Sequence, residues 1–274
     1  MTSEEYHLFQ QFLKQSCGIV LGSEKQYLVR SRLTPVLKEF HLKSFKDLLR
    51  LLNKPSIQSK RLMIRVIDSR TTNETSWFRE KAHFLELEEA ILPRLITNQS
   101  RKLRVWSAAC STGQEAYSLS ICIDQFLKQQ PSAITQDIDI IGTDISENAI
   151  KVAKQAEYPE MAITRGLGKA ARASFFDQIH GGYKLKTEIS NRARFQQFNL
   201  LKPMAVLGQF DIIFCRNVFI YFSEQIKKDI LRRMAEILKP KGVLFLGRTE
   251  AMPSDLKAFQ VIDGHHCQYY QKTD

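Results

Sequence analysis

The sequence predicts an α/β fold with a mostly parallel sheet, preceded by an N-terminal helical domain and interrupted by a small inserted β-subdomain. From residue 103 onward, short apolar segments alternate with amphipathic helical segments, as in βαβ units. Residues 1–70 place apolar side chains at helical spacing and show no strand pattern. About 35 residues separate two elements before residue 193, where such connections usually take about 2–6 residues.

These observations divide the chain into three segments. Residues 1–70 form the helical domain, residues 71–102 form a linker and a helix that contribute to a ligand pocket, and residues 103–274 form the α/β domain. The β-subdomain is expected at about 158–192, where His180-Gly181-Gly182 indicates a small hairpin.

Composition fits a globular protein of the cytoplasm. The chain has 274 residues, of which 43% are hydrophobic and 25% charged, which is ordinary for a folded domain with a full core. It contains no apolar run of the roughly 20 residues that span a bilayer, and its start lacks the pattern of a secretory signal. Its five cysteines form no C-x-x-C pair, so we expect reduced thiols and no metal site.

The charge is strongly positive and unevenly distributed. The net charge is +11, and residues 25–70 contain twelve Lys/Arg against three Asp/Glu. Such a run is often a solvated helical surface, but it also suits an acidic partner, either nucleic acid or an acidic protein helix. Charge alone leaves these partners open.

The main sheet is expected to contain six parallel strands and one final antiparallel strand. Residues 146–155 and 223–238 read as helices that open with a capping serine, and residues 239–242 close the second helix and lead into the next strand. Asp263-Gly264 predicts a hairpin that reverses the last strand. This is the arrangement of a class I, Rossmann-like methyltransferase sheet. The predicted strands are 103–108, 138–142, 193–198, 210–215, 243–247, 259–262 and 267–271.

The segment Arg104–Ser120 reads as a strand, a tight loop of small residues at 109–113, and a helix. Small residues let a ligand approach the backbone, and the helix N-terminus presents free N–H groups. A single glycine makes this a weak signal for a nucleotide-like cofactor. Asp144, which follows the next predicted strand, strengthens it because a carboxylate there can accept both ribose hydroxyls. The 31 residues from Gly113 to Asp144 exceed the roughly 20 of NAD-binding units.

Polar residues also follow the third and fourth strands. Asn199 follows the third strand, where its amide can hydrogen-bond an adenine edge. The fourth strand is followed by Arg216 and Asn217 and then by Tyr221, at the expected mouth of the site.

Four segments together resemble the CheR-type chemotaxis receptor methyltransferases. They are T-T-N-E-T-S-W-F-R-E at 71–80, R-V-W-S-A-A-C-S-T-G-Q-E at 104–115, G-T-D at 142–144 and F-C-R-N-V-F-I-Y-F at 214–222. The resemblance covers nearly the whole chain. It implies that S-adenosylmethionine is the cofactor, leaving as S-adenosylhomocysteine, and that glutamates on cytoplasmic helices of transmembrane chemoreceptors become methyl esters.

The resemblance also implies roles for individual residues. Arg79 and Tyr221 would lie beside the reacting methyl group, and Arg30, Arg32 and Lys38 would face the acidic receptor helices. No catalytic base is needed, because a glutamate with a pKa near 4.3 is already ionised at neutral pH. The residues expected to bind the cofactor are Asn73, Thr75, Arg79, Ala109, Glu115, Asp144, Asn199, Leu200, Arg216 and Asn217.

Three departures from the family pattern stand out. Gln114 and Ala116 replace the usual Glu and Pro around Glu115, Trp77 replaces a Phe, and Gly247-Arg-Thr-Glu250 replaces Gly-His-Ser-Glu. In addition, the short hairpin at His180–Gly182 suggests a member that does not use a receptor's C-terminal pentapeptide as a tether. We expect no nucleic-acid partner, no insertion into a membrane and, by default, a monomer.

Two rival functions are considered. A methyltransferase acting on RNA or DNA would suit the positive charge, but the chain has no Asn/Asp-Pro-Pro-Tyr/Phe box and no recognisable RNA-binding module. A non-catalytic adaptor that binds the cofactor and docks on receptor arrays is suggested only by the altered segment at 247–250.

Overall fold

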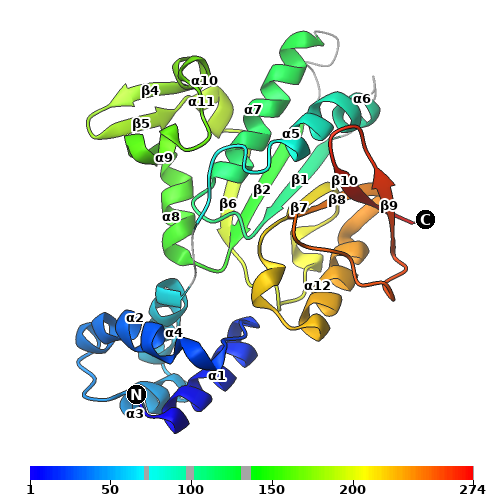
Figure 1. Ribbon diagram of the computed structural model, residues 1–274. Coiled ribbons are helices and arrows are strands. Elements are labelled where there is room, and N and C mark those ends of the chain that lie inside the picture. Colours follow the sequence, from blue (N-terminus) through cyan, green and yellow to red (C-terminus); the bar gives the residue numbers. More distant parts are fainter. Residues whose placement is uncertain (71–73, 97–101, 131–136, 274) are drawn as a thin grey trace.

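The computed structural model describes residues 1–70, 74–96, 102–130 and 137–273 (Figure 1). Its main sheet has seven strands in the order β6-β2-β1-β7-β8-β10-β9. The first five are mutually parallel, and β10 is antiparallel to both of its neighbours, which confirms the predicted arrangement. The strands are β1 (Leu103–Ala108), β2 (Ile138–Asp144), β6 (Ala193–Gln197), β7 (Phe210–Cys215), β8 (Leu238–Leu246), β9 (Phe259–Asp263) and β10 (Gln268–Lys272).

The register brings three strand ends together. Ala108 at the end of β1 lies opposite Thr143 of β2 on one side and opposite Cys215 of β7 on the other. The residues that follow these strands therefore leave the sheet at the same edge. Ligands bind at this carboxyl edge in open α/β sheets.

Helices cover both faces of the sheet. One core joins the sheet to α7 (Gln114–Gln129), α8 (Glu147–Gln155) and the helical run α5 (Ala82–Glu86), η2 (Leu87–Ile91, a π-helical turn) and α6 (Leu92–Leu95). A second core joins the other face to α12 (Glu224–Ile237) and η4 (Ala205–Leu207). Successive strand residues point to opposite faces, so Val105 enters the first core and Trp106 the second.

One predicted boundary is wrong. Residues 239–242 were expected to close the helix and precede a strand, but α12 ends at Ile237 and β8 begins at Leu238. The register between β7 and β8 is irregular here, with Phe210 opposite Leu238 and Ile212 opposite Val243. A bulge thus absorbs the Pro-Gly-containing segment within the strand, as bulges do.

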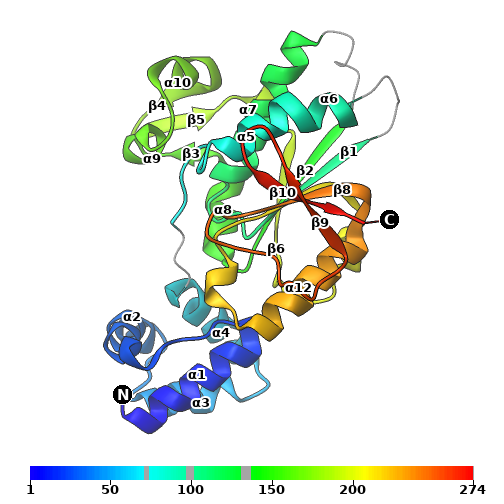
Figure 2. The same cartoon turned by 45° about the vertical axis from the view of Figure 1, so that its right-hand side comes forward.

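The helical domain has its own core and docks on the sheet domain. Its helices are α1 (Ser3–Cys17), η1 (Ser23–Lys25), α2 (Gln26–Glu39), α3 (Phe45–Leu52) and α4 (Ile57–Arg70). It lies below the sheet in both views (Figure 2). Two contacts attach it near the carboxyl edge: Asn199 Nδ2 donates to the Ser16 carbonyl at 2.8 Å, and Val20 N donates to the Tyr221 carbonyl at 2.9 Å.

The inserted β-subdomain packs beside the helices on one face of the sheet (Figure 1), and Tyr158 Oη of its first strand donates to the Thr112 carbonyl, in the loop after β1, at 2.8 Å. It contains a three-stranded antiparallel sheet in the order β3-β5-β4. The hairpin predicted around His180–Gly182 joins β4 to β5, whereas β3 was not predicted. The elements are β3 (Glu157–Tyr158), α9 (Glu160–Thr164), α10 (Lys169–Phe175), β4 (Phe176–Ile179), β5 (Gly182–Leu185) and α11 (Thr187–Ser190).

Across the described residues, every helix is too short or too polar to cross a lipid bilayer.

Candidate active site

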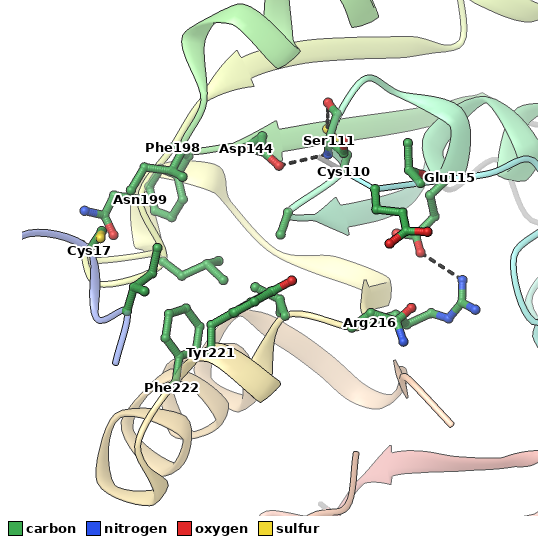
Figure 3. Close-up of a pocket in the computed structure, with 18 of the residues that line it drawn as sticks. Cys17, Cys110, Ser111, Glu115, Asp144, Phe198, Asn199, Arg216, Tyr221 and Phe222 are labelled. Carbon is green, nitrogen blue, oxygen red and sulfur yellow. Dashed lines mark hydrogen bonds and ion pairs between the residues drawn. The ribbon is translucent and has the colours of Figure 1, made fainter. Parts of the chain in front are cut away.

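A cavity of about 260 Å³ opens at the carboxyl edge of the sheet (Figure 3). Its walls come from the loops after β1, β2, β6 and β7, from the helical domain, and from residues 74–80, which we name the strap. The strap runs from the linker to α5 and contributes Glu74, Thr75, Ser76 and Arg79 to the lining.

The structure gathers most of the predicted site residues around this cavity. Asn73 lies outside the described residues. Arg30 and Lys38 are exposed on α2 and are absent from the lining, whereas Arg32 belongs to it. The predicted residues that line the cavity are Thr75, Arg79, Ala109, Glu115, Asp144, Asn199, Leu200, Arg216, Asn217 and Tyr221.

Asp144 fixes the loop that follows β1. Its Oδ2 accepts the backbone N–H of Ser111 at 2.8 Å, and its Oδ1 accepts that of Ser146 at 2.9 Å. Each carboxylate oxygen has two lone pairs, so both can still accept a ligand hydroxyl. Burial raises the pKa of Asp144, although the hydrogen bonds from Ser146 and Ser111 act in the opposite direction.

Arg216 lies buried between two carboxylates. Its Nη1 pairs with Glu115 Oε2 at 2.9 Å, and its Nη2 pairs with Glu80 Oε2 at 3.0 Å and also donates to the carbonyl of Arg79. Its side chain is only 1% exposed. The guanidinium therefore links the helix after β1, the end of β7 and the strap. Figure 3 shows Glu115 and Arg216 at the opposite end of the cavity from Phe198 and Asn199.

The charges of this group follow from its surroundings. Burial opposes ionisation of Glu80, but the hydrogen bond from Asn217 and the charge of Arg216 outweigh it and lower the pKa of Glu80. Burial raises the pKa of Glu115, against the influence of Arg216. Burial and Arg216 also lower the pKa of His83 to about 4, so this histidine adds no second positive charge at neutral pH.

Two glutamates that the sequence did not assign organise the polar end. Glu80 also accepts hydrogen bonds from Asn217 Nδ2 at 3.1 Å and from the backbone N–H of Arg248 at 3.0 Å. Glu250 accepts three backbone N–H groups, from Asn217, Phe219 and Gly247, at 2.7–2.8 Å. Both residues end segments quoted in the sequence analysis, Glu80 at 71–80 and Glu250 at 247–250, and membership of those segments was the only signal that could have pointed to them.

The backbone around the cavity is strained. Five of the eight non-glycine residues with positive φ among those described lie in the strap or in the loops after β1 and β7. Such conformations cost on the order of 1–3 kcal/mol each and persist only where surrounding contacts impose them. The hydrogen bonds to Asp144, Glu80 and Glu250 supply those contacts. The five residues are Phe78, Glu80, Ala109, Ser111 and Asn217.

The remaining predicted residues occupy the other end and the opening. The amide of Asn199, expected to bond an adenine edge, bonds the Ser16 carbonyl and the backbone N–H of Leu201. Arg79 Nη1 donates to the carbonyl of Glu74 at 3.2 Å. Tyr221, on η5 (Phe219–Tyr221), extends into the cavity between the two ends (Figure 3).

The cavity suits S-adenosylmethionine. Phe198 gives one end of the cavity an aromatic surface that fits a flat base, and Asp144 lies between this end and the polar one (Figure 3). Arg216 Nε is buried and has no hydrogen-bond partner among the described residues. An orphaned buried donor at the polar end favours a ligand with a carboxylate, as in the methionine part of the cofactor.

Comparisons with known proteins agree with this geometry. The family model described as "CheR methyltransferase, all-alpha domain" matches residues 4–69, and "CheR methyltransferase, SAM binding domain" matches residues 73–267. Chemotaxis protein methyltransferase 1 of Pseudomonas aeruginosa is 44% identical over 262 residues, with 94% of each chain covered. Chemotaxis protein methyltransferase Cher2 of Pseudomonas putida is 43% identical over 250 residues, with 90% of each chain covered.

A further relative, the chemotaxis protein methyltransferase of Vibrio parahaemolyticus, is 39% identical over 263 residues, covering 96% of this chain and 94% of the relative. The two family models together span almost the whole sequence. The chain therefore belongs to the CheR methyltransferase family of S-adenosylmethionine-dependent chemotaxis methyltransferases.

Proposed function

We propose that the protein transfers the methyl group of S-adenosylmethionine to glutamate side chains of chemoreceptors, forming glutamyl methyl esters. One observation supports this choice of substrate above all. Lys25 and Arg32 of the basic helical domain line the same cavity as Asp144, Glu115 and Arg216. The positive docking surface and the cofactor pocket therefore meet in one cavity, as an acidic substrate requires.

The cofactor contacts follow from the placement of the polar groups. Asp144 takes the ribose hydroxyls, and Leu200 and Asn199 flank the adenine. Arg216 and Asn217 hold the methionine part, with Glu115 beside them. Thr75 and Arg79 close the pocket from the strap.

Arg79 orients the substrate carboxylate. The two Nη atoms of Arg216 already pair with Glu80 and Glu115, and its remaining donor, Nε, is assigned to the methionine part of the cofactor, so Arg216 does not bind the substrate carboxylate. Arg79 donates one hydrogen bond, to a backbone carbonyl, among the described residues and keeps donors for an incoming carboxylate. A weak interaction between Arg79 and the substrate carboxylate favours the reaction, because a strong ion pair would reduce the nucleophilicity of the carboxylate.

Catalysis then depends on alignment. The bound cofactor supplies a methyl group on a sulfonium, which a carboxylate attacks in line. A substrate glutamate is ionised at neutral pH, so the protein has no proton to remove. Holding the two reactants in line and excluding water is worth up to ~7–11 kcal/mol. Tyr221 shapes the approach from the mouth of the cavity.

The partner is a cytoplasmic receptor helix, and we place the protein in the cytoplasm with it. The β-subdomain is proposed to work without a pentapeptide tether at the receptor's C-terminus. In support, only His180 and Gly181 lie between β4 and β5, and Gly181 has a φ of 84°. A loop this short offers few residues for an additional peptide contact.

The first prediction concerns the product. Incubation with methyl-labelled S-adenosylmethionine and membranes carrying the organism's own chemoreceptors should label receptor bands, and mild base should release the label, since methyl esters are base-labile. Receptors with and without a C-terminal pentapeptide should be labelled at equal rates. Cofactor binding without labelled receptor would contradict the proposal and favour an adaptor, and label in added RNA or DNA would favour a nucleic-acid enzyme.

The second prediction concerns Tyr221. The Tyr221→Phe variant should lower kcat by about two- to twelvefold, because one hydrogen bond contributes ~0.5–1.5 kcal/mol. Its affinity for S-adenosylhomocysteine should stay within about twofold of wild type. Tyr183→Phe, in the β-subdomain, is the matched control. Full turnover by Tyr221→Phe would remove the hydroxyl from this account.

The third prediction concerns the basic surface of α2. Arg30 and Lys38 are exposed and lie outside the cavity lining, so reversing both charges should raise KM for the receptor at least about tenfold, more at low salt than at high salt. Affinity for the cofactor should not change. Reversing Lys169 and Lys257, exposed in other parts of the chain, is the control. An unchanged KM would mean that this surface does not dock the substrate.

A further inference from the structure

The strap is held along its whole length. Glu80 anchors its end to the loops after β7 and β8, as described above. In its middle, the backbone N–H of Phe78 donates to Ser118 Oγ of α7 at 3.0 Å. Its first half, Glu74 to Trp77, is held by the inserted β-subdomain. This half includes Thr75 and Ser76, which line the cavity.

Three contacts form the junction between the strap and the subdomain. Arg165 Nη2 pairs with Glu74 Oε1 at 2.5 Å, and the backbone N–H of Trp77 donates to the Arg165 carbonyl at 3.2 Å. The Trp77 ring is 1% exposed and packs edge-on against Tyr158 and Phe176, at centroid distances of 5.1 and 5.0 Å. Both of these rings belong to strands of the subdomain.

Gly166 adds a further close approach between the subdomain and the strap. Its φ is +109°, and a Cβ placed on it would overlap the carbonyl oxygen of Trp77. The backbone of the subdomain therefore lies directly against the backbone of the strap at Trp77, two residues before Arg79. A displacement of the subdomain at Gly166 would displace the strap.

We infer that the inserted β-subdomain supports the cofactor site from outside the cavity, with Arg165 and Gly166 as positioning residues that hold the strap in place. The inference rests on the proposed assignment of Thr75 and Arg79 to the cofactor. The subdomain would thus position the strap at the cavity whether or not it also binds a receptor's C-terminal tail. Because coupling between two sites is reciprocal, cofactor binding should also stabilise the contact between strap and subdomain.

Gly166→Ala tests the inference, with Gly181→Ala as the matched control. Both glycines belong to the subdomain and have positive φ, at +109° and +84°, so both substitutions strain the backbone. A Cβ at Gly181 meets no atom within 4 Å, whereas one at Gly166 meets the strap. Calorimetric titration with S-adenosylhomocysteine should show roughly tenfold or more weaker binding for Gly166→Ala, because each hydrogen bond lost between the strap and the ligand weakens binding by about two- to twelvefold.

The control Gly181→Ala should bind within about twofold of wild type. Equal affinities of the two folded variants would overturn the inference. If Gly166→Ala does not fold, Arg165→Ala replaces it, since this change removes only the pair with Glu74. Its control is Lys184→Ala, which removes another exposed ion pair of the subdomain, with Glu157. Weaker binding for Arg165→Ala alone supports the inference, and equal binding refutes it.

Two further measurements separate the inference from the proposed function. At saturating S-adenosylmethionine, Gly166→Ala should recover most of its turnover, because the strap positions the cofactor and a raised KM for it is the expected defect. Asp144→Ala should abolish S-adenosylhomocysteine binding. If Asp144→Ala still binds S-adenosylhomocysteine, the assignment of the cavity to the cofactor is wrong. If Asp144→Ala loses binding but Gly166→Ala binds normally, only the inference about the strap is refuted.

Discussion

The buried guanidinium of Arg216 is the interaction on which the rest of the site depends. It sits between Glu80 of the strap and Glu115 of α7, and it extends from the end of β7. Breaking a buried ion pair by removing one partner costs ~3–5 kcal/mol, because the other charge stays buried and unpaired. The strap, the sheet and α7 are thus held in one arrangement. Three residues with positive φ, Phe78, Glu80 and Asn217, lie in the strap and in the loop that carries Arg216.

The site combines an acidic interior with a basic rim. Glu115 lines the polar end of the cavity, Glu80 pairs with Arg216 behind it, and Asp144 lies between the polar and apolar ends, so carboxylates line the part that binds the sulfonium and ribose of the cofactor. Lys25 and Arg32 line the same cavity from the helical domain, which is the side assigned to the proposed acidic substrate. One cavity can therefore bind a cofactor with a positively charged sulfonium and, in the proposed function, a negatively charged substrate. The division into domains serves this chemistry, because the basic surface is built separately and docked near the carboxyl edge through Asn199 and Val20.

Much of this could be predicted from the sequence. The alternation of strands and helices gave the main sheet and its reversed last strand, and the motif residues around Ala109, Asp144 and Arg216 converge on one cavity because parallel strands end at a common edge. The bulge within β8, the strand β3 and the roles of Glu80 and Glu250 were not predicted. These depend on contacts between distant segments, such as Glu80 with Arg248, and no local pattern encodes them.

The most direct test of this account is the affinity of Glu80→Gln for S-adenosylhomocysteine, measured by calorimetry on protein shown to be folded by circular dichroism. Glutamine keeps the size of the side chain but loses the charge that pairs with Arg216. Glu89→Gln, which alters an exposed carboxylate paired with His266, is the control. We predict a loss of affinity of about tenfold or more for Glu80→Gln and none for Glu89→Gln. Binding by Glu80→Gln within about twofold of wild type would contradict the claim that this ion group holds the cofactor site together.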